Sequence, residues 1–370
     1  MRSSRAGRAL IAAACILALA GCAAAPATRH PPSTGFAAAR DAAALADRVA
    51  RSDAVIAQYV GASEPGCSAA VGRKGTVLWA GAGGLADLDA GIPVTTSTRF
   101  DIASISKQFT ATAVLMLERE GALSLGDPVS AYVDGLPAWG SSVTLEQLMH
   151  QTSRIPDYWV ELDEIGIGFS DPADQQQTVA AIRREKKLEP GEGFLYSNSN
   201  YVLLAEVVER VSGQTLPDFL AARIFEPLGL AMVLAPTLHA DDIALSYDDD
   251  QHLQEAGWTS YGHTGIITTP SELVRWGDQY REGDLIQDDN LAGAVEENDG
   301  SGDYYAAGIN IQPDGDLAHS GRMGGFISVF TVSADRQTVI AVACNGHLMN
   351  RTPINDALWD IWEPSDHPVE

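Results

Sequence analysis

A serine and a lysine stand three residues apart in the segment Phe100–Lys107, where Ser104 is followed by Lys107. The residues after Ser104 predict a helix, so the two side chains share one face of it. A serine hydroxyl becomes a good nucleophile when a neighbour takes its proton, and a lysine does so when burial or another cation lowers its pKa. Backbone N–H groups at a helix N-terminus also stabilise an oxyanion. The pair therefore predicts acyl transfer to Ser104.

A Ser-x-x-Lys pair is a weak motif by itself, because random sequences of this length often contain one. The surroundings of Lys107 make this motif stronger evidence for a catalytic role. The chain has only three other lysines, at Lys74, Lys186 and Lys187, and the residues around Lys107 are mostly apolar or small. A lysine in such a helix is costly unless it has a use.

The second candidate element is the segment Pro190–Tyr201, which contains Tyr196 and Asn198. We expect both residues in a loop, where functional side chains often lie. A tyrosine near a lysine ammonium ionises more readily and then acts as a general base, while an asparagine amide holds both the lysine and a substrate carbonyl. The alternative is an aromatic core residue beside a turn-forming asparagine.

The third candidate element is the run His319, Ser320, Gly321 and Arg322, which we place at the end of a strand. A glycine there lets a ligand backbone approach the strand edge closely. That geometry suits a peptide-like substrate that pairs with the edge, and the N–H of Arg322 would be a second oxyanion donor. The alternative for His319 is a hydrogen-bonded histidine of the core.

The elements that position these residues follow from hydrophobic periodicity and from turn residues. We predict helices over Asp41–Val60, Ser104–Glu120, Tyr201–Val211 and Ile354–Trp362, and strands within Gly66–Gly83, Asp316–His319, Phe326–Ser333 and Thr338–Cys344. Strands at both ends of the chain around a helical middle predict one sheet built from both ends. We place the sheet part at 41–124 and 256–365 and the inserted, mostly helical part at 125–255.

The first residues are typical of an export signal. Met1–Arg5 is basic, and the apolar run Ala9–Ala20 is too short to span a bilayer. The end of this signal, Leu19–Cys22, resembles a bacterial lipobox, which predicts cleavage after residue 21 and a lipid on Cys22. A simple secretory signal cut at alanine-rich residues is the alternative. Residues 22–40 are expected to form a flexible tether.

The net charge limits the kinds of molecule that the chain is expected to bind. The chain has 24 Lys and Arg against 49 Asp and Glu, a formal charge of -25, which repels nucleic acids and anionic lipid surfaces. We therefore expect a small peptide-like or ester substrate, no nucleic acid, and contact with a membrane only through a lipid anchor.

Cys15 leaves with the signal, so Cys67 and Cys344 remain beside Cys22. In an oxidising compartment they form a disulfide or stay two separate buried thiols.

Taken together, the Ser-x-x-Lys, Tyr-x-Asn and His-x-Gly elements resemble those of the serine β-lactamase and penicillin-binding-protein-like superfamily, in order and approximate spacing. The closest branch holds the class C β-lactamases, the DD-carboxypeptidases and related esterases. The resemblance covers about residues 45 to 365, within a domain that we place at 41–365. It extends to Gly121–Pro128, Leu148–Tyr158 and Gly262–Pro270. Gln151 and Arg154 replace the usual His and Gly of the second of these segments, which predicts an altered loop.

The resemblance implies a fold and a role for each residue. The fold is an α/β sandwich with an antiparallel sheet of about five strands flanked by helices. Ser104 is the acylated nucleophile, Lys107 and Tyr196 share the proton transfers, Asn198 orients the substrate, and His319 lines the far wall, without metal or organic cofactor. The first strand lies beside the last in the family, which brings Cys67 close to Cys344.

The function that follows is an exported serine hydrolase of the DD-peptidase, D-amino-acid peptidase or esterase type, held at the periplasmic or cell surface by its lipid. Class C β-lactamases carry a lysine where His319 stands, which predicts poor hydrolysis of β-lactams. The alternatives are a catalytically weak β-lactamase and a protein that keeps the fold and only binds muropeptides.

Overall fold

The computed structural model describes residues 34–254, 256–346 and 351–363. Two compact units divide after Leu45, and helix α1 (Thr34–Tyr59) begins in the first unit and ends in the second, which holds every other described element. The expected signal, 1–21, and Cys22 lie outside the described residues. Residues 34–40, which we assigned to a tether, are helical. The alanine-rich sequence explains the earlier start, because alanine has the highest helix propensity.

The main sheet of the second unit is antiparallel and has eight strands among the described residues, in the order β2-β1-β13-β12-β11-β10-β9-β8. Five of them are long: β1 (Cys67–Arg73), β2 (Thr76–Gly83), β11 (Leu317–Met323), β12 (Phe326–Val332) and β13 (Thr338–Cys344). The other three have two residues each: β8 (Val295–Glu296), β9 (Tyr304–Tyr305) and β10 (Asn310–Ile311). The predicted fold class is confirmed, and the expected number of about five strands was too small by these short ones.

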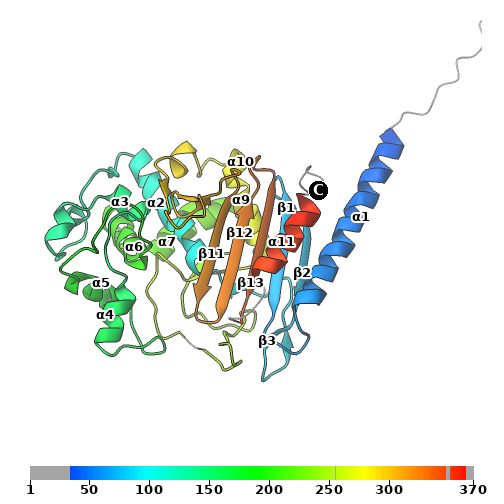
Figure 1. The fold of residues 1–370 in the computed structure, drawn as a ribbon, viewed down its shortest axis with the longest axis horizontal. Coiled ribbons are helices and arrows are strands. Elements are labelled where there is room, and N and C mark those ends of the chain that lie inside the picture. The colour runs from blue at the N-terminus through cyan, green and yellow to red at the C-terminus, as the bar shows by residue number, and fades with distance from the viewer. Residues whose placement is uncertain (1–33, 255, 347–350, 364–370) are drawn as a thin grey trace, which may run out of the picture. The chain divides into compact units, whose positions relative to one another are not determined.

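Segments from the two halves of the chain meet in this sheet, because β1 pairs with β13 along its whole length, from Cys67 opposite Cys344 to Arg73 opposite Thr338. Alternate residues face opposite layers, as in any strand buried on both faces. One face packs against α11 (Arg351–Trp362) and the end of α1, and the other against α9 (Pro270–Gly277). Figure 1 shows α11, in red, lying across β12 and β13.

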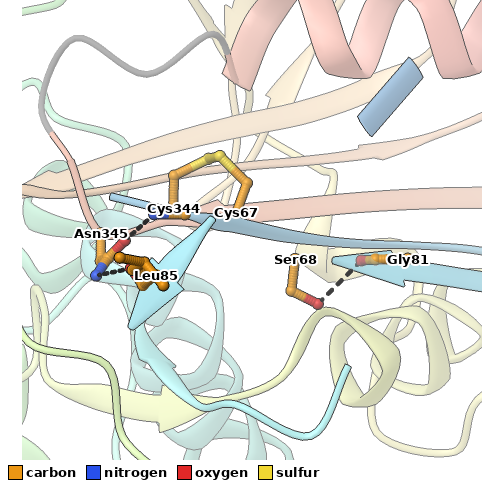
Figure 2. Close-up of a disulfide and its surroundings, with 7 residues drawn as sticks. Cys67, Ser68, Gly81, Leu85, Cys344 and Asn345 are labelled. Carbon is orange, nitrogen blue, oxygen red and sulfur yellow. Dashed lines mark hydrogen bonds between the residues drawn. A yellow bond between two sulfur atoms is a disulfide. The ribbon is translucent and has the colours of Figure 1, made fainter. Parts of the chain in front are cut away.

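A disulfide joins Cys67 to Cys344 across this strand pair, with an S–S distance of 2.07 Å. Figure 2 shows Asn345 beside the bond, where its Nδ2 donates to the carbonyl of Leu85 at 3.2 Å. The Oδ1 of Asn345 accepts from the backbone N–H of Gly66 at 2.6 Å. The pairing expected from the family is therefore present, and the polar groups next to it are hydrogen-bonded.

Between the two parts of the chain that form the long strands, most of the regular elements are helices. The helices are α2 (Lys107–Arg119), α3 (Leu145–Met149), α4 (Tyr158–Glu164), α5 (Gln175–Arg184), α6 (Asn198–Ser212), α7 (Leu216–Leu220), α8 (Glu226–Leu228) and α10 (Gln279–Glu282). Gly213 ends α6 with a φ of 71°, a left-handed conformation that glycine adopts easily. Helices α2 and α6 pack against each other. This contact brings the Ser-x-x-Lys and Tyr-x-Asn segments together.

Two small sheets complete the described part of the chain. Their strands are β3 (Leu85–Asp87) with β4 (Ile92–Pro93), and β5 (Phe100–Asp101) with β7 (Ile266–Thr268) and β6 (Val233–Leu234). Strand β5 of the second sheet lies directly before the turn that carries Ser104. Within the described ranges, no helix combines the length and the apolar character needed to cross a membrane.

Candidate active site

Ser104 lies in a short 3-10 turn, η1 (Ala103–Ser106), and the regular helix α2 starts only at Lys107. The predicted start of a helix at Ser104 was therefore three residues early. The turn begins with Ala103 at a φ of 50°, which is strained for a residue with a side chain. The N–H of Ala103 donates to Oδ1 of Asp101 at 2.7 Å. This turn places Oγ of Ser104 within 3.0 Å of Nζ of Lys107.

Lys107 is fully buried at the centre of the site. Besides the contact with Ser104, its Nζ donates to Oδ1 of Asn198 at 2.8 Å and to the carbonyl of His263 at 3.1 Å. Burial lowers the pKa of Lys107 from 10.5 to about 7, and the charge of Asp157 partly opposes this shift. A large fraction of the lysine is therefore neutral at neutral pH, and a neutral amine accepts a proton.

Tyr196 lies over the same lysine, with Nζ of Lys107 4.9 Å from the ring centre. The residue keeps 36% of its surface exposed, but burial of the hydroxyl raises its pKa well above the usual value, and a hydrogen bond with Ser104 only partly offsets this. The hypothesis that the nearby ammonium makes Tyr196 ionise readily was wrong, because burial, together with the charges of Asp157 and Glu297, raises the pKa of its hydroxyl. Tyr196 keeps its proton at neutral pH and serves as a hydrogen-bond donor.

Asn198 is the first residue of α6, so its expected place in a loop was wrong by one position. Its Oδ1 faces Lys107, and its Nδ2 donates to Oδ2 of Asp157 at 2.9 Å. The backbone N–H of Asn198 donates to the same carboxylate oxygen, also at 2.9 Å. Asp157 thereby fixes which way the amide points. The contact of Asn198 with a substrate stays a prediction.

His319 lies in the middle of β11, not at its end, and is buried. Its Nδ1 is 2.7 Å from the carbonyl of Ser320, a contact that needs a proton on this nitrogen. Burial lowers the pKa of His319 to about 3, and the charge of Lys107 adds to the effect. His319 is therefore neutral at pH 7, with Nε2 as an acceptor 3.4 Å from the hydroxyl of Tyr305.

Gly321 is needed for a reason that the sequence did not reveal. A Cβ at this position would lie 2.4 Å from the carbonyl oxygen of Ile102 and 3.0 Å from Cβ of Ala103. Only glycine lets β11 pass so close to the turn that carries the nucleophile. Arg322 follows on the same strand and also lines the cavity beside Ser104. The oxyanion contact of its N–H stays a prediction.

Within the described residues, strand β10 covers the outer edge of β11 only at Leu317 and Ala318. Beyond that point the edge of β11 lines a cavity of about 770 Å³ that also contains Ser104. Trp159 and Phe169 form apolar parts of its wall. An extended acyl compound fits such an open edge by main-chain pairing.

Two carboxylates, Glu297 and Asp303, line another part of this cavity. Burial raises the pKa of each, and Nδ2 of Asn310 donates to Oε1 of Glu297 at 2.9 Å. Among the described residues, neither makes an ion pair with Lys, Arg or His within 4.0 Å. They come from the region of the short strands β8 and β9, which the sequence did not predict.

Sequence reasoning missed several residues that hold the site. Asp157 orients Asn198, His263 accepts from Lys107 through its carbonyl, and Asp101 holds the turn before Ser104. All three lie in segments that carry the Ser-x-x-Lys motif or the family resemblance. Their types gave no signal: the contacts of Asp157 and His263 join residues that are far apart in the chain, and Asp101 bonds to the nearby Ala103 only in a turn that the sequence did not predict. Within the described part of the chain, no group of three or more His, Cys, Asp or Glu side chains has a metal-binding arrangement.

Comparison with known proteins agrees with this geometry. Residues 52–360 match the sequence model of the family described as Beta-lactamase. The chain is 30% identical to penicillin-binding protein 4* of Bacillus subtilis over 302 residues, which cover 72% of this chain and 65% of that protein. It is also 30% identical to a D-aminopeptidase of Brucella anthropi over 282 residues, which cover 71% and 52% of the two proteins. The chain thus spans about half to two thirds of these relatives.

A solved structure gives the same result for the fold. The octameric penicillin-binding protein homologue from Pyrococcus abyssi superposes with a TM-score of 0.69 at 25% identity. The match covers 89% of this chain and 76% of the homologue. The predicted superfamily is confirmed by these matches.

Proposed function

The chain belongs to the Beta-lactamase family, and we propose that it is a serine hydrolase that forms an acyl-enzyme on Ser104. One observation carries this proposal: the Nζ of Lys107 lies 3.0 Å from Oγ of Ser104, and its pKa is lowered to about 7. A base with a pKa near the working pH is the most effective proton acceptor for a hydroxyl nucleophile.

The proposed reaction has two halves that use the same groups. Neutral Lys107 takes the proton of Ser104 while Oγ attacks the substrate carbonyl, and N–H groups of Ser104 and Arg322 hold the oxyanion. The bond to the leaving group then breaks, and the leaving nitrogen or oxygen receives the proton from Lys107 through the hydroxyl of Tyr196. Water attacks the acyl-Ser104 ester in the second half and gives its proton to Lys107. The acid is released and Ser104 recovers its proton.

The proposed substrates are peptide-like amides or esters, of the DD-peptidase, D-amino-acid peptidase or esterase type. The open edge of β11 supports an extended acyl compound. The similarity to a penicillin-binding protein and to a D-aminopeptidase supports peptide-like amides.

The charges in the cavity support poor turnover of β-lactams. A penicillin or cephalosporin carries a carboxylate, and a cation normally recognises it. His319 is neutral, and the carboxylates of Glu297 and Asp303 repel an anion in the same cavity. A missing charge-assisted hydrogen bond weakens recognition by about 1.5 to 3 kcal/mol, or one to two orders of magnitude.

A substrate panel tests the proposal. We would measure kcat/KM for a D-alanine p-nitroanilide, a neutral p-nitrophenyl ester and a chromogenic cephalosporin, with Ser104→Ala as the control. We expect turnover of the anilide or the ester, slow cephalosporin turnover that rises in His319→Lys, and no turnover by Ser104→Ala. Efficient cephalosporin turnover by the wild type would contradict the proposed substrate class. No turnover and no acylation with any compound would favour a muropeptide-binding protein.

We further propose that the protein is exported and anchored by a lipid on Cys22. The disulfide between Cys67 and Cys344 supports export, because such bonds persist in oxidising compartments. Growth with an alkyne-bearing fatty acid, followed by capture of the protein, tests the anchor. We expect labelling that disappears in Cys22→Ser. Equal labelling of both forms would show that the lipid, if any, is elsewhere.

A further inference from the structure

Asp101 is a buried carboxylate directly before the nucleophile turn, and the reaction scheme above does not use it. Only 6% of the residue is exposed, and it lies in the two-residue strand β5. A single oxygen, Oδ1, accepts from the N–H of Ala103 at 2.7 Å, from the N–H of Gly265 at 3.3 Å and from Oγ1 of Thr264 at 3.4 Å. One carboxylate thus contacts two separate segments of the chain.

These two segments hold the two reacting side chains. The first is the turn that begins at Ala103 and carries Ser104. The second runs from His263 to Gly265, and the carbonyl of His263 accepts from Nζ of Lys107 at 3.1 Å. The position of the nucleophile relative to its base therefore depends on how the two segments are joined, and Asp101 joins them.

The turn also needs such a hold because it is strained. Ala103 has a φ of 50°, a conformation that persists only where the surrounding contacts enforce it. Its N–H bond to Asp101 is the shortest of the three that Oδ1 accepts. An ionised oxygen binds N–H donors more strongly than a neutral one. Protonation of the carboxylate would therefore loosen the hold on Ala103.

We propose that Asp101 is a positioning residue of this active site: its ionised carboxylate holds the turn of Ser104 against the segment that holds Lys107, so that protonation of Asp101 slows acylation. This inference rests on the proposed role of Ser104. It adds a control by pH that acts on the geometry of the nucleophile rather than on the base.

The ionisable surroundings of Asp101 are simple. Burial raises its pKa from 3.8 to about 6, and its three hydrogen bonds only partly oppose the shift. Among the described residues that share a small side cavity with Asp101, His239 is the other ionisable one. Lys107 has its own pKa of about 7. Two protonations therefore slow the reaction below pH 6, one at the base and one at the positioning carboxylate.

The test is the rate at which a fluorophosphonate modifies Ser104 between pH 5 and pH 8. In this reaction the Oγ–phosphorus bond forms, fluoride leaves, and Lys107 takes the proton, so no natural substrate is needed. We expect the wild-type rate to fall about 30- to 50-fold from pH 6 to pH 5, and that of Asp101→Asn about tenfold, because only Lys107 then titrates. At pH 8 the rate for Asp101→Asn should be lower than that of the wild type by a factor of at least about 10.

Asp316→Asn is the matched control. Asp316 is another buried carboxylate whose Oδ1 accepts a backbone N–H, that of Ala334 at 2.6 Å, in a turn of the sheet. Burial raises its pKa as well. We expect Asp316→Asn to keep the wild-type pH profile. A profile altered as much as in Asp101→Asn would show that the effect is not specific to the carboxylate beside Ser104, and would overturn the inference.

Thr264→Val is a second variant for the case that Asp101→Asn does not fold. It removes a donor that lowers the pKa of Asp101, so the steeper part of the profile should begin at higher pH. An Asp101→Asn profile as steep as the wild type, or an unmoved Thr264→Val profile, would overturn the inference. A wild type that the probe does not modify would instead contradict the proposed role of Ser104.

Discussion

The active site and the β1–β13 pair are both buried, but they treat polar groups in opposite ways. Around the disulfide, Cys67 and Cys344 pack with apolar side chains from both strands and from α11, and Asn345 bonds to the neighbouring backbone. At the active site, Lys107 and Asp101 are ionisable groups removed from water, and their pKa values move toward neutrality. The first arrangement stabilises the fold, whereas the second lowers stability and creates reactivity.

This difference in the treatment of polar groups shows where function is located in the molecule. A lysine with a pKa of about 7 and a carboxyl with a pKa of about 6 are each less favourable in the fold than in water. Such groups persist where their reactivity or positioning is used. Variants of the active site should therefore lose activity and gain stability, while variants of the β1–β13 pair should lose stability and keep activity.

Lys107→Met gives the largest expected effect. The variant loses the base, and acylation of Ser104 should slow by about 10²- to 10⁴-fold. Burial lowers the pKa of Lys107, so the protonated lysine destabilises the fold at all pH values below its folded pKa. The variant should therefore be more stable than the wild type at pH 6 in urea unfolding. Lys187→Met, at an exposed position, is the control and should change neither quantity. A slow and destabilised Lys107→Met would contradict the comparison.

Replacement of both Cys67 and Cys344 by serine tests the other region. The disulfide closes a loop with a sequence separation of 277. Chain-entropy reasoning gives an upper value of about 5.6 kcal/mol for the stability lost in the double variant. We expect kcat/KM at 25 °C to stay near the wild-type value, because the bond lies two strands away from β11. A large loss of activity in fully folded protein would show that the two regions are coupled. Alkylation and mass spectrometry of the unreduced wild type should find no free thiol at these positions.

Asp101→Asn should raise stability while it lowers activity. A carboxyl whose pKa rises from 3.8 to about 6 on folding costs about 3 kcal/mol when it is ionised. The sign follows from linkage: the folded state binds this proton more tightly, so stability is highest below pH 4 and is lost as pH rises through 6. Unfolding of both forms at pH 8 should therefore show the variant more stable by up to about 3 kcal/mol. A stability difference between the variant and the wild type that is the same at pH 4 as at pH 8 would refute the assigned burial penalty.

The sequence predicted the parts of this molecule that depend on local pattern. The strands around Cys67 and Cys344 were predictable because apolar residues fill them, and the helix of Lys107 because its apolar residues repeat at the helical period. Strands β8 to β10 have two residues each, which is too short for any period. The sequence therefore gave no sign of the cavity wall that carries Glu297 and Asp303.

The sequence predicted which motif residues form the site better than it predicted their pKa values and hydrogen-bond partners. Tyr196 was expected to ionise readily beside Lys107, but the sign of its pKa shift depends on burial by residues far away in the chain. Asp101 and Asp157 looked like ordinary polar residues, since their contacts with Gly265 and Asn198 join distant segments, although Asp101 also accepts from the nearby Ala103. Motif spacing places side chains together, but only the packed structure determines their hydration.

The most direct test of the account is the mass of the intact protein after reaction with a fluorophosphonate. We expect the wild type to gain one adduct, which peptide mapping places on Ser104. Ser104→Ala should gain none while its circular dichroism and thermal unfolding stay unchanged, because only the attacking oxygen is lost. A folded Ser104→Ala that is modified as fast as the wild type, or a wild-type adduct on another residue, would contradict the central claim that Ser104 is the nucleophile.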